Sequence, residues 1–382
     1  MFSALKEAFY HEVNSIKNSW YKLFLITLLP LISFSIIIAI FYAGVARDLP
    51  VVVVDNDQSE LSRQIIKDID ATSTIEVKYK VNSASQAIDL VKKSKAYAVI
   101  VIPNNFSKDT LLQKKPNVTT MVNTQYILIG KILTSALTST IMQSSGKVEY
   151  VKSLVDSQNP HSSINSIAPI GMQITPFFNT YKNYYFFLVS ALLPAIWQIF
   201  IVISTLVSVG LMFKYNRQKE FFKNQEHIGA KLIGLLLPYT IAYMILGLIY
   251  LFYIYSSWEF QGSILVLIFG MFLTIVAYQG MALLLFISNF DYARSLSLGA
   301  VYTAPAFAFL GITFPMYNMN NFALFWRDLL PVSHYTQIQI SQGNYGVDPY
   351  MEIGKLLTIA CFWIVFIPVL LAFKKRMKKE FS

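Results

Sequence analysis

Residues 23–54 read LFLITLLPLISFSIIIAIFYAGVARDLPVVVV and join two kinds of structure at one boundary. Residues 23–44 carry no charged side chain and are long enough to cross the roughly 30 Å hydrocarbon core of a bilayer. The apolar run 51–54, ended by Asp55, is typical of a strand buried on both faces. The stretch therefore predicts a membrane span that leads directly into a folded domain outside the bilayer.

The composition indicates a protein that crosses the membrane several times. Hydrophobic residues make up 55% of the 382 residues and charged residues only 14%. The predicted spans are 23–44, 184–212, 232–255, 264–288, 297–313 and 356–373. The fifth is the shortest and contains Pro305. The expected fold is a polytopic α-helical membrane protein with six transmembrane helices and a mixed α/β extracytoplasmic domain inserted between helices 1 and 2.

The polar segment between the first two spans alternates strand and helix patterns. Strands are expected at 51–54, 75–81, 97–102 and 118–122. Helices are expected from a capping box of Asp57 and Glu60 to Asp70, from a second box of Ser83 and Gln86 to Lys95, and over 106–113. These patterns predict a small mixed sheet covered by helices.

A long helix is expected at 126–155, which contains no proline. Its broken apolar stripe consists of Leu133, Leu137, Ile141, Val148, Val151 and Val155. We expect this stripe to pack either on its own domain or on a second copy of the chain. Residues 157–180, with three prolines, are the expected return linker to the membrane.

The N-terminus has a helical pattern of its own. Phe2, Leu5, Phe9, Val13 and Ile16 recur at steps of three and four. The helix either lies in the membrane interface as an elbow or packs on its own protein, and the pattern does not choose between them. The expected domains are thus 1–45 (elbow helix and first span), 46–182 (extracytoplasmic domain) and 183–382 (five further spans).

The basic residues predict the orientation. With six spans the basic residues named next all fall on one side, whereas the short loop 256–263 has none. They are Lys6, Lys17 and Lys22 before the first span, Lys214, Arg217, Lys219, Lys223 and Lys231 after the second, Arg294 after the fourth, and Lys374, Lys375, Arg376, Lys378 and Lys379 after the last. The lysines of the segment between the first two spans do not argue against this, because long translocated domains largely escape the rule. Both termini of this multi-pass protein are therefore expected to be cytoplasmic.

Several classes of function are disfavoured by what the sequence lacks. The predicted spans contain no Asp, Glu, Lys, Arg or His, which argues against an ion-coupled carrier and an intramembrane enzyme. The lone Cys361 offers no disulfide and no metal spacing, and we expect no metal, no cofactor and no catalytic residue in this chain.

The basic residues cluster at span ends, so the net charge of +10 does not indicate nucleic-acid binding. No phosphate-binding loop is present, so energy for active transport would come from another subunit.

The intracellular segment 213–230 is the best candidate for a handle on such a subunit, and we call it the coupling segment. Charged side chains flank two adjacent aromatic ones, a pattern suited to docking in a partner's groove. The candidate coupling residues are Lys214, Arg217, Lys219, Glu220, Phe221, Phe222 and Lys223. The simpler alternative is a positively charged stop between two spans.

A second motif follows the fifth span. Residues 310–316 read LGITFPM, and 322–331 read FALFWRDLLP before His334 and Tyr335. The order of glycine, Phe-Pro, amphipathic segment and Leu-Leu-Pro resembles the C-terminal signature of ABC-2 type transport permeases. The layout also resembles their subgroup with a large external domain between the first two of six spans.

The resemblance implies roles for both segments. The coupling segment would contact a separate ABC ATPase that carries the ATP, and residues 322–342 would form short re-entrant helices near the outer mouth. The candidate outer gate residues are Gly311, Phe314, Pro315, Phe325, Trp326 and Pro331. Physically, the apolar side chains of 322–330 form one face opposite Arg327 and Asp328, as suits a helix at a membrane interface.

These observations lead to the expectation of a permease subunit of an ABC exporter. It would work with an ATPase subunit and with a second copy or a similar chain, in contact with membrane lipid. Its uncharged spans favour amphipathic, lipid-like or drug-like cargo, and a periplasmic adaptor is a further expected partner. The alternative is a membrane-anchored receptor or envelope assembly scaffold that acts through its external domain.

Overall fold

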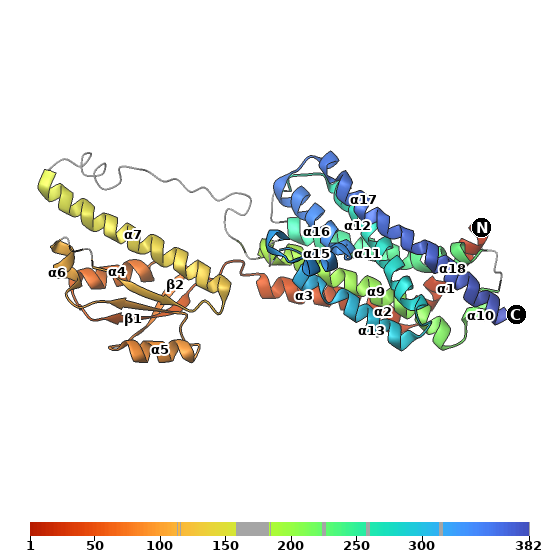
Figure 1. The fold of residues 1–382 in the computed structure, drawn as a ribbon, viewed down its shortest axis with the longest axis horizontal. Coiled ribbons are helices and arrows are strands. Elements are labelled where there is room, and N and C mark those ends of the chain that lie inside the picture. Colours follow the sequence, from red (N-terminus) through yellow and green to blue (C-terminus); the bar gives the residue numbers. More distant parts are fainter. Residues whose placement is uncertain are drawn as a thin grey trace. The chain divides into compact units, whose positions relative to one another are not determined.

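The computed structural model describes residues 1–112, 114, 116–157, 183, 185–223, 227–256, 260–312 and 316–381. The chain divides into two compact units, Met1–Gly44 with Pro176–Ser382 and Val45–Thr175 (Figure 1). Each unit has its own hydrophobic core. Apart from Ser157, the predicted linker 157–180 lies outside the described residues.

The smaller unit is a four-stranded mixed sheet with helices on both faces. Its strands are β1 (Leu49–Asp55), β2 (Ile75–Lys80), β3 (Ala98–Ile102) and β4 (Thr119–Val122). The order is β2-β1-β3-β4, with β1 parallel to both neighbours and β4 antiparallel to β3. Its helices are α4 (Glu60–Asp70), α5 (Ala84–Lys92), α6 (Phe106–Leu111) and α7 (Ile127–Ser157). The predicted strands and helices of this unit are confirmed.

The central strand β1 explains why residues 51–54 are continuously apolar. Val51 and Val53 belong to the core beneath α4 and α7, while Val52 and Val54 belong to the core beneath α5. Figure 1 shows α5 on one face of the sheet and α4 and α7 on the other. A strand buried on both faces has no position for a polar side chain.

The predicted capping box at the start of α4 is displaced by two residues. The N-cap is Ser59, whose hydroxyl accepts a hydrogen bond from the backbone N–H of Ser62 at 3.0 Å. The Asp57 carboxylate instead accepts a hydrogen bond from the backbone N–H of Ser107, in the first turn of α6, at 3.0 Å. The prediction of Asp57 as the cap was wrong because this carboxylate has a partner distant in the sequence.

Helix α7 packs on its own domain. Leu133 and Leu137 are buried in the core that includes α4. Further along α7, Ser144 and Lys147 donate to the Asp68 carboxylate of α4 at 2.8 and 3.1 Å. Burial acts to raise the pKa of Asp68, but hydrogen bonds from Ser144, Lys147 and Gln64 outweigh it and hold the pKa below its ordinary value of 3.8. Polar side chains of α7 outside the apolar stripe therefore also fix this helix to its own unit.

The larger unit contains the membrane helices. Among the described residues, five helical stretches are long and apolar enough to cross a membrane, at Trp20–Phe41, Tyr185–Lys214, Ile228–Tyr255, Ile264–Ile287 and Pro349–Glu380. They consist of α2 (Trp20–Ile26) with α3 (Leu28–Phe41), η1 (Tyr185–Val189) with α9 (Ser190–Lys214), α11 (Ile228–Tyr255), α12 (Ile264–Ile287), and η5 (Pro349–Glu352), α17 (Ile353–Cys361), η6 (Phe362–Val365) and α18 (Phe366–Phe381). They coincide with five of the six predicted spans.

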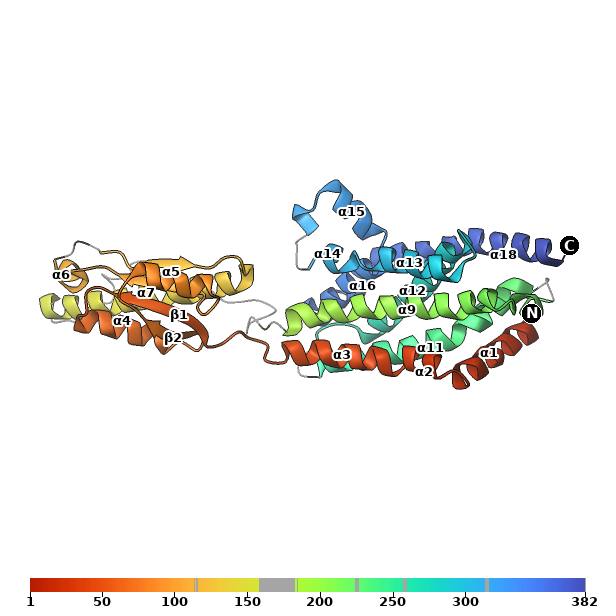
Figure 2. The same cartoon turned by 90° about the horizontal axis from the view of Figure 1, so that it is seen from below.

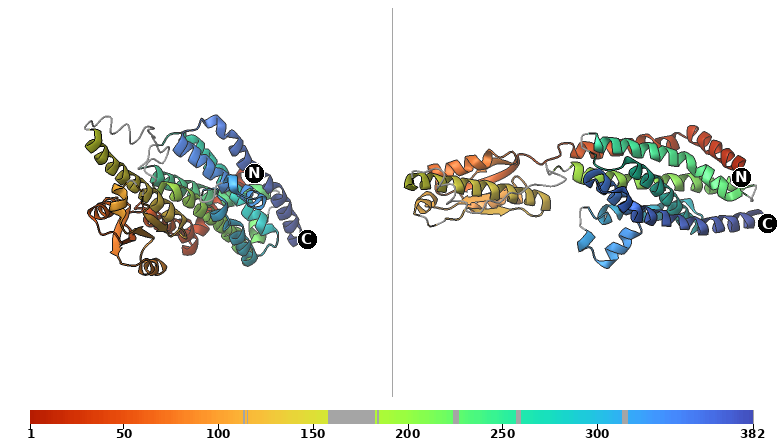
Figure 3. Two further views of the ribbon diagram at one scale, coloured as in Figure 1. Left: turned by 60° about the vertical axis from the view of Figure 1, so that its left-hand side comes forward. Right: turned by 90° about the horizontal axis from the view of Figure 1, so that it is seen from above.

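The predicted span 297–313 is not one continuous helix. It is covered by α13 (Tyr292–Thr303) and the single turn α14 (Ala306–Phe309), with the break at Pro305. Proline lacks the backbone N–H that would continue the helix. At 1.5 Å per residue α13 alone is about 18 Å long, which is too short for the bilayer core. A sixth crossing therefore stays a prediction, although Figures 2 and 3 place both termini at the same end of this unit, as an even number of crossings requires.

The N-terminal helix α1 (Phe2–Lys17) packs along α11, as Figure 2 shows. Its buried side chains are Ala4, Ala8, Glu12 and Ile16. Of the apolar residues in the sequence pattern, Ile16 is buried, Leu5, Phe9 and Val13 are half-buried, and Phe2 is 78% exposed. Packing on its own protein is thus confirmed, and the contact includes two alanines as well as part of the predicted apolar face.

The close approach of α1 to α11 depends on Gly234. A Cβ at this position would lie 2.3 Å from the backbone oxygen of Leu5, whereas at Gly229 on the same helix the nearest atom is a Leu370 side-chain carbon at 3.4 Å. We expect Gly234→Ala to lower the free energy of unfolding by about 1–3 kcal/mol, because the clash is with backbone. Gly229→Ala is the matched control and should be neutral or slightly stabilising. Thermal unfolding of the purified protein measures both, and equal midpoints would contradict the close contact.

Candidate functional site

The coupling segment lies at the end of the larger unit where both termini are found (Figure 1). It contains the end of α9, the short helix α10 (Gln218–Phe221) and the start of α11. Five of its candidate residues are exposed, namely Lys214, Arg217, Lys219, Glu220 and Lys223. Phe221 is half-buried, Phe222 is fully buried, and Glu226 lies outside the described residues.

Phe222 packs inside the protein. Its ring centroid lies 6.0 Å from that of Phe373 in α18. Phe373 in turn contacts Phe213, Phe286 and Phe290, at the ends of α9 and α12. We call these five residues the phenylalanine cluster. The prediction that both aromatic residues are exposed docking anchors is therefore wrong for Phe222, because its side chain is enclosed by these rings.

Phe221 connects the segment to two other helices. Its ring lies 5.1 Å from the His11 ring of α1, and its backbone carbonyl accepts a hydrogen bond from the Lys231 ammonium of α11. Gln218 adds a third connection by donating to the Glu380 carboxylate of α18 at 3.1 Å. The coupling segment is thus in direct contact with α1, α11 and α18, and through the phenylalanine cluster with α9 and α12.

A buried ion pair beside this segment was missed by sequence reasoning. Glu12 of α1 accepts hydrogen bonds from Lys22 at 2.8 Å, Tyr239 at 2.6 Å and Ser208 at 3.0 Å. Both charged residues are buried, and Lys22 also donates to Ser15 at 2.9 Å. The sequence did contain a sign that Glu12 is buried. Ala4, Ala8, Glu12 and Ile16 recur every four residues, so Glu12 shares one helix face with three apolar residues.

Residues 310–342, which we call the outer segment after its predicted location, include a helix with two different faces. Helix α15 (Asn321–Asp328) begins at Asn320, whose side chain accepts from the backbone N–H of Ala323 at 2.9 Å. Phe325 is exposed, Trp326 is half-buried and Arg327 is only 5% exposed. Arg327 is turned toward the protein, but Asp328, which was predicted to share its face, is exposed. The predicted division of this helix into two faces is therefore wrong for Asp328. Desolvation lowers the pKa of Arg327 below its ordinary value, although the adjacent Asp328 carboxylate acts in the opposite sense.

Gly311 stands at the bend before this helix. It has a φ of +83°, which suits glycine because a side chain there would be strained. A Cβ at Gly311 would come within 3.7 Å of the Arg327 Nε. The gate candidates Phe314 and Pro315 lie outside the described residues.

Helix α16 (Pro331–Ile340) starts at Pro331 and enters the core of the unit. The backbone N–H of Val332 donates to the Tyr278 hydroxyl of α12 at 3.2 Å, and Gln339 donates to the backbone oxygen of Ser190 in α9 at 2.7 Å. A short helix that begins at the outer segment is thereby hydrogen-bonded to two spans, as expected of a re-entrant element.

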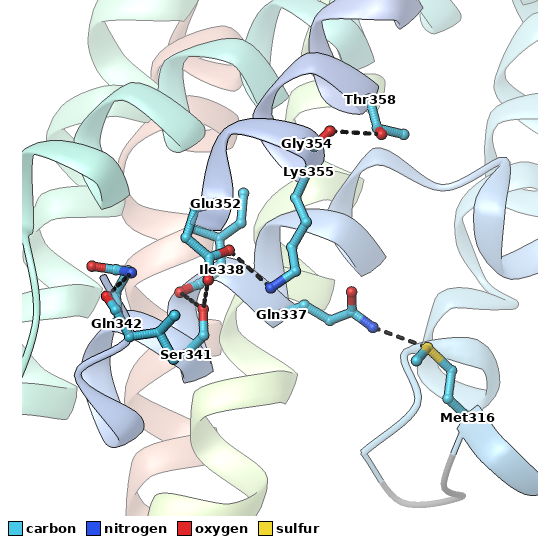
Figure 4. A network of polar contacts seen from close by, with 10 residues as sticks. Met316, Gln337, Ile338, Ser341, Gln342, Glu352, Gly354, Lys355 and Thr358 are labelled. Carbon is cyan, nitrogen blue, oxygen red and sulfur yellow. Dashed lines mark hydrogen bonds and ion pairs between the residues drawn. The ribbon is translucent and has the colours of Figure 1, made fainter. Parts of the chain in front are cut away.

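The end of α16 is tied to the start of the last span by a buried carboxylate. Figure 4 shows Ser341 and Lys355 converging on Glu352, with oxygen–oxygen and nitrogen–oxygen distances of 2.6 and 2.8 Å. The same view shows Gln337 donating to the Met316 sulfur at 3.0 Å. Movement of the last span would therefore be transmitted to α16.

Across the described part of the chain, no group of His, Cys, Asp and Glu side chains is arranged to hold a metal ion. Residues 20–374 match the family described as ABC-2 family transporter protein. A comparison with curated proteins finds no match. The match spans the predicted membrane helices, the α/β unit and the coupling and outer segments.

Proposed function

Because the chain belongs to the ABC-2 family of transporter proteins, we propose that it is the permease subunit of an ABC exporter. A separate ATPase subunit would bind and hydrolyse ATP and would drive the movement of cargo across the membrane. The observation that carries this proposal concerns the coupling segment. Its charged side chains are exposed, while its Phe221, Phe222 and Gln218 contact other helices of the membrane unit.

The contacts of this segment suggest how force would pass from the ATPase to the membrane. A displacement of α10 would move the adjacent Phe222 against Phe373 and the other rings of the phenylalanine cluster. It would also move Phe221 against α1 and α11. Close-packed aromatic rings transmit such a displacement because they leave little space to absorb it. Two arrangements of the spans, inward-facing and outward-facing, would then be biased by the nucleotide state.

The interior of the spans supports an amphipathic, lipid-like or drug-like cargo. Buried tyrosine and glutamine side chains supply hydrogen bonds without full charge, as in the pair of Tyr250 with Tyr335 at 3.1 Å. Two of the buried ionisable residues, Lys22 and Glu352, lie near the ends of the helical stretches and have ionic partners. The outer segment would act as the gate through which such cargo leaves.

The remaining parts of the proposal concern assembly and location. We propose that two copies, or this chain and a similar one, form the transport path in a bacterial inner membrane with the termini in the cytoplasm. The α/β unit would then be periplasmic, as in the subgroup with a large external domain, and could contact an adaptor protein. The scaffold alternative has less support, since the family match extends over the spans and not only over the external unit.

The test is co-purification of the full-length protein with a soluble ATP-hydrolysing subunit. Reversing two exposed charges with Lys219→Glu and Lys223→Glu is expected to reduce the recovered ATPase about tenfold, since contacts between complementary charges at an interface are worth one or more kcal/mol. Lys17→Glu, an exposed change on α1 outside the coupling segment, is the control. Recovery of no ATPase with the unaltered protein would refute the proposal, and equal recovery with all variants would refute the assignment of the segment.

A further inference from the structure

A cavity of about 510 Å³ lies between the elbow helix α1, the end of α9 and the coupling segment. Its lining includes the buried Glu12–Lys22 pair and the charged residues Glu7, Arg217, Glu220 and Lys231. The volume falls within the range of about 300–1,000 Å³ that is usual for small-molecule sites. Phe221 and His11 of the force path also line this cavity, but that path gives no role to its carboxylates Glu7 and Glu220.

The charges around the cavity are balanced. Glu12 and Lys22 neutralise each other at 2.8 Å. Two cations then remain, Arg217 and Lys231, together with two carboxylates, Glu7 and Glu220. An anion alone would be repelled by the carboxylates and a cation alone by the basic groups. The complementary ligand therefore carries both charges.

The residues at the edge of the cavity place it at a membrane surface. Tyr21, at the start of the first span, and Tyr215, directly after α9, both line it and are both exposed. Trp20 beside them is 78% exposed. Exposed Tyr and Trp at the ends of spans are typical of the lipid headgroup level. The cavity thus opens where a ligand with both charges is abundant, namely the headgroup of a zwitterionic phospholipid.

We propose that this cavity binds the headgroup of a phospholipid with a primary ammonium group, from the leaflet on the side of the termini. Arg217 and Lys231 would hold the phosphate, and the Glu7 and Glu220 carboxylates would accept hydrogen bonds from the ammonium group. Since residues of both α1 and the coupling segment line the cavity, the bound lipid would join the elbow helix to the segment. This inference does not depend on the ATPase assignment.

Native mass spectrometry of the full-length protein, exchanged into equal mixtures of phosphatidylethanolamine, phosphatidylcholine and phosphatidylglycerol, tests the proposal. We expect preferential retention of phosphatidylethanolamine, because a quaternary ammonium group donates no N–H and phosphatidylglycerol carries no cation. The double variant Glu7→Gln/Glu220→Gln should lose this preference over phosphatidylglycerol by about tenfold or more, the usual effect of removing charge-assisted hydrogen bonds. Arg217→Gln should weaken retention of all three lipids.

Matched variants control for net charge and for folding. Glu76→Gln/Glu149→Gln removes the same charge in the α/β unit, and Lys219→Gln removes one exposed cation of the coupling segment that does not line the cavity. Neither should change the lipid preference. Equal retention of the three lipids by the unaltered protein would overturn the proposal. Binding of free phosphoethanolamine with no retained phosphatidylethanolamine would also overturn it, because the source would then be soluble.

Discussion

Replacing Glu12 with leucine is expected to lower the free energy of unfolding by about 3–5 kcal/mol, the usual cost of leaving a buried charge without its partner. Lys22 would lose its ionic partner at 2.8 Å while staying 5% exposed. Two further donors, Tyr239 and Ser208, would lose their acceptor. Thermal unfolding of the purified full-length protein, with hydrogen exchange over residues 2–17, measures the loss and locates it at α1.

The double variant Glu12→Leu/Lys22→Met separates the ion pair from the packing around it. Replacing both members of a buried pair with apolar side chains is often neutral, so this variant should recover most of the stability. Lys17→Gln, an exposed cation on the same helix, should have no effect. If Glu12→Leu alone left the unfolding midpoint unchanged, the buried pair would not be what fixes the elbow helix.

The α/β unit could be predicted closely from its sequence because each of its elements has a local cause. The alternation from Ile75 to Val81 and the unbroken valines of β1 define strands, and Ser83 accepts the capping hydrogen bond from Gln86 at 3.4 Å as expected. The strand order could not be predicted in this way. It depends on pairings such as that of Val51 with Ala98, which lie far apart in the sequence.

The membrane unit was predicted less well at positions where a polar side chain is buried or an apolar side chain is exposed. In a water-soluble protein the apolar face of a helix is the buried one, but the pattern of α1 left open whether that face lies in the membrane interface or packs on the protein. Next to lipid the apolar face has an apolar solvent, so α1 buries Glu12 and two alanines beside Ile16 and leaves Phe2 exposed. The same reversal turns Phe325 outward and Arg327 inward in α15.

The coupling segment illustrates a limit of composition. Phe221 and Phe222 are identical and adjacent, and nothing local distinguishes them. The difference arises from α18, more than 140 residues later, whose Phe373 encloses only the second ring. Substituting the two residues separately therefore tests a difference that the structure shows and the local sequence does not predict.

Phe222→Ala is expected to lower the free energy of unfolding by about 3–5 kcal/mol, because it removes a fully buried aromatic ring and leaves a cavity. Phe221→Ala should cost clearly less, since its ring is half-buried and the hydrogen bond from Lys231 is made to its backbone. Thermal unfolding midpoints of the two purified variants measure this difference. Phe222→Leu, which keeps most of the buried volume, should recover more than half of the loss.

The same two variants also separate stability from coupling. Phe221→Ala should retain the fold and still co-purify with an ATPase, while ATP hydrolysis should respond less to transported cargo, because the contact of the segment with His11 of α1 is lost. Phe222→Ala should lower the amount of folded protein, and the activity of the remaining fraction should fall as well, since the phenylalanine cluster loses its link to α10. If both variants proved equally stable and equally coupled, neither ring would transmit force, and the path from the coupling segment to the spans would have to run through Gln218 and α18.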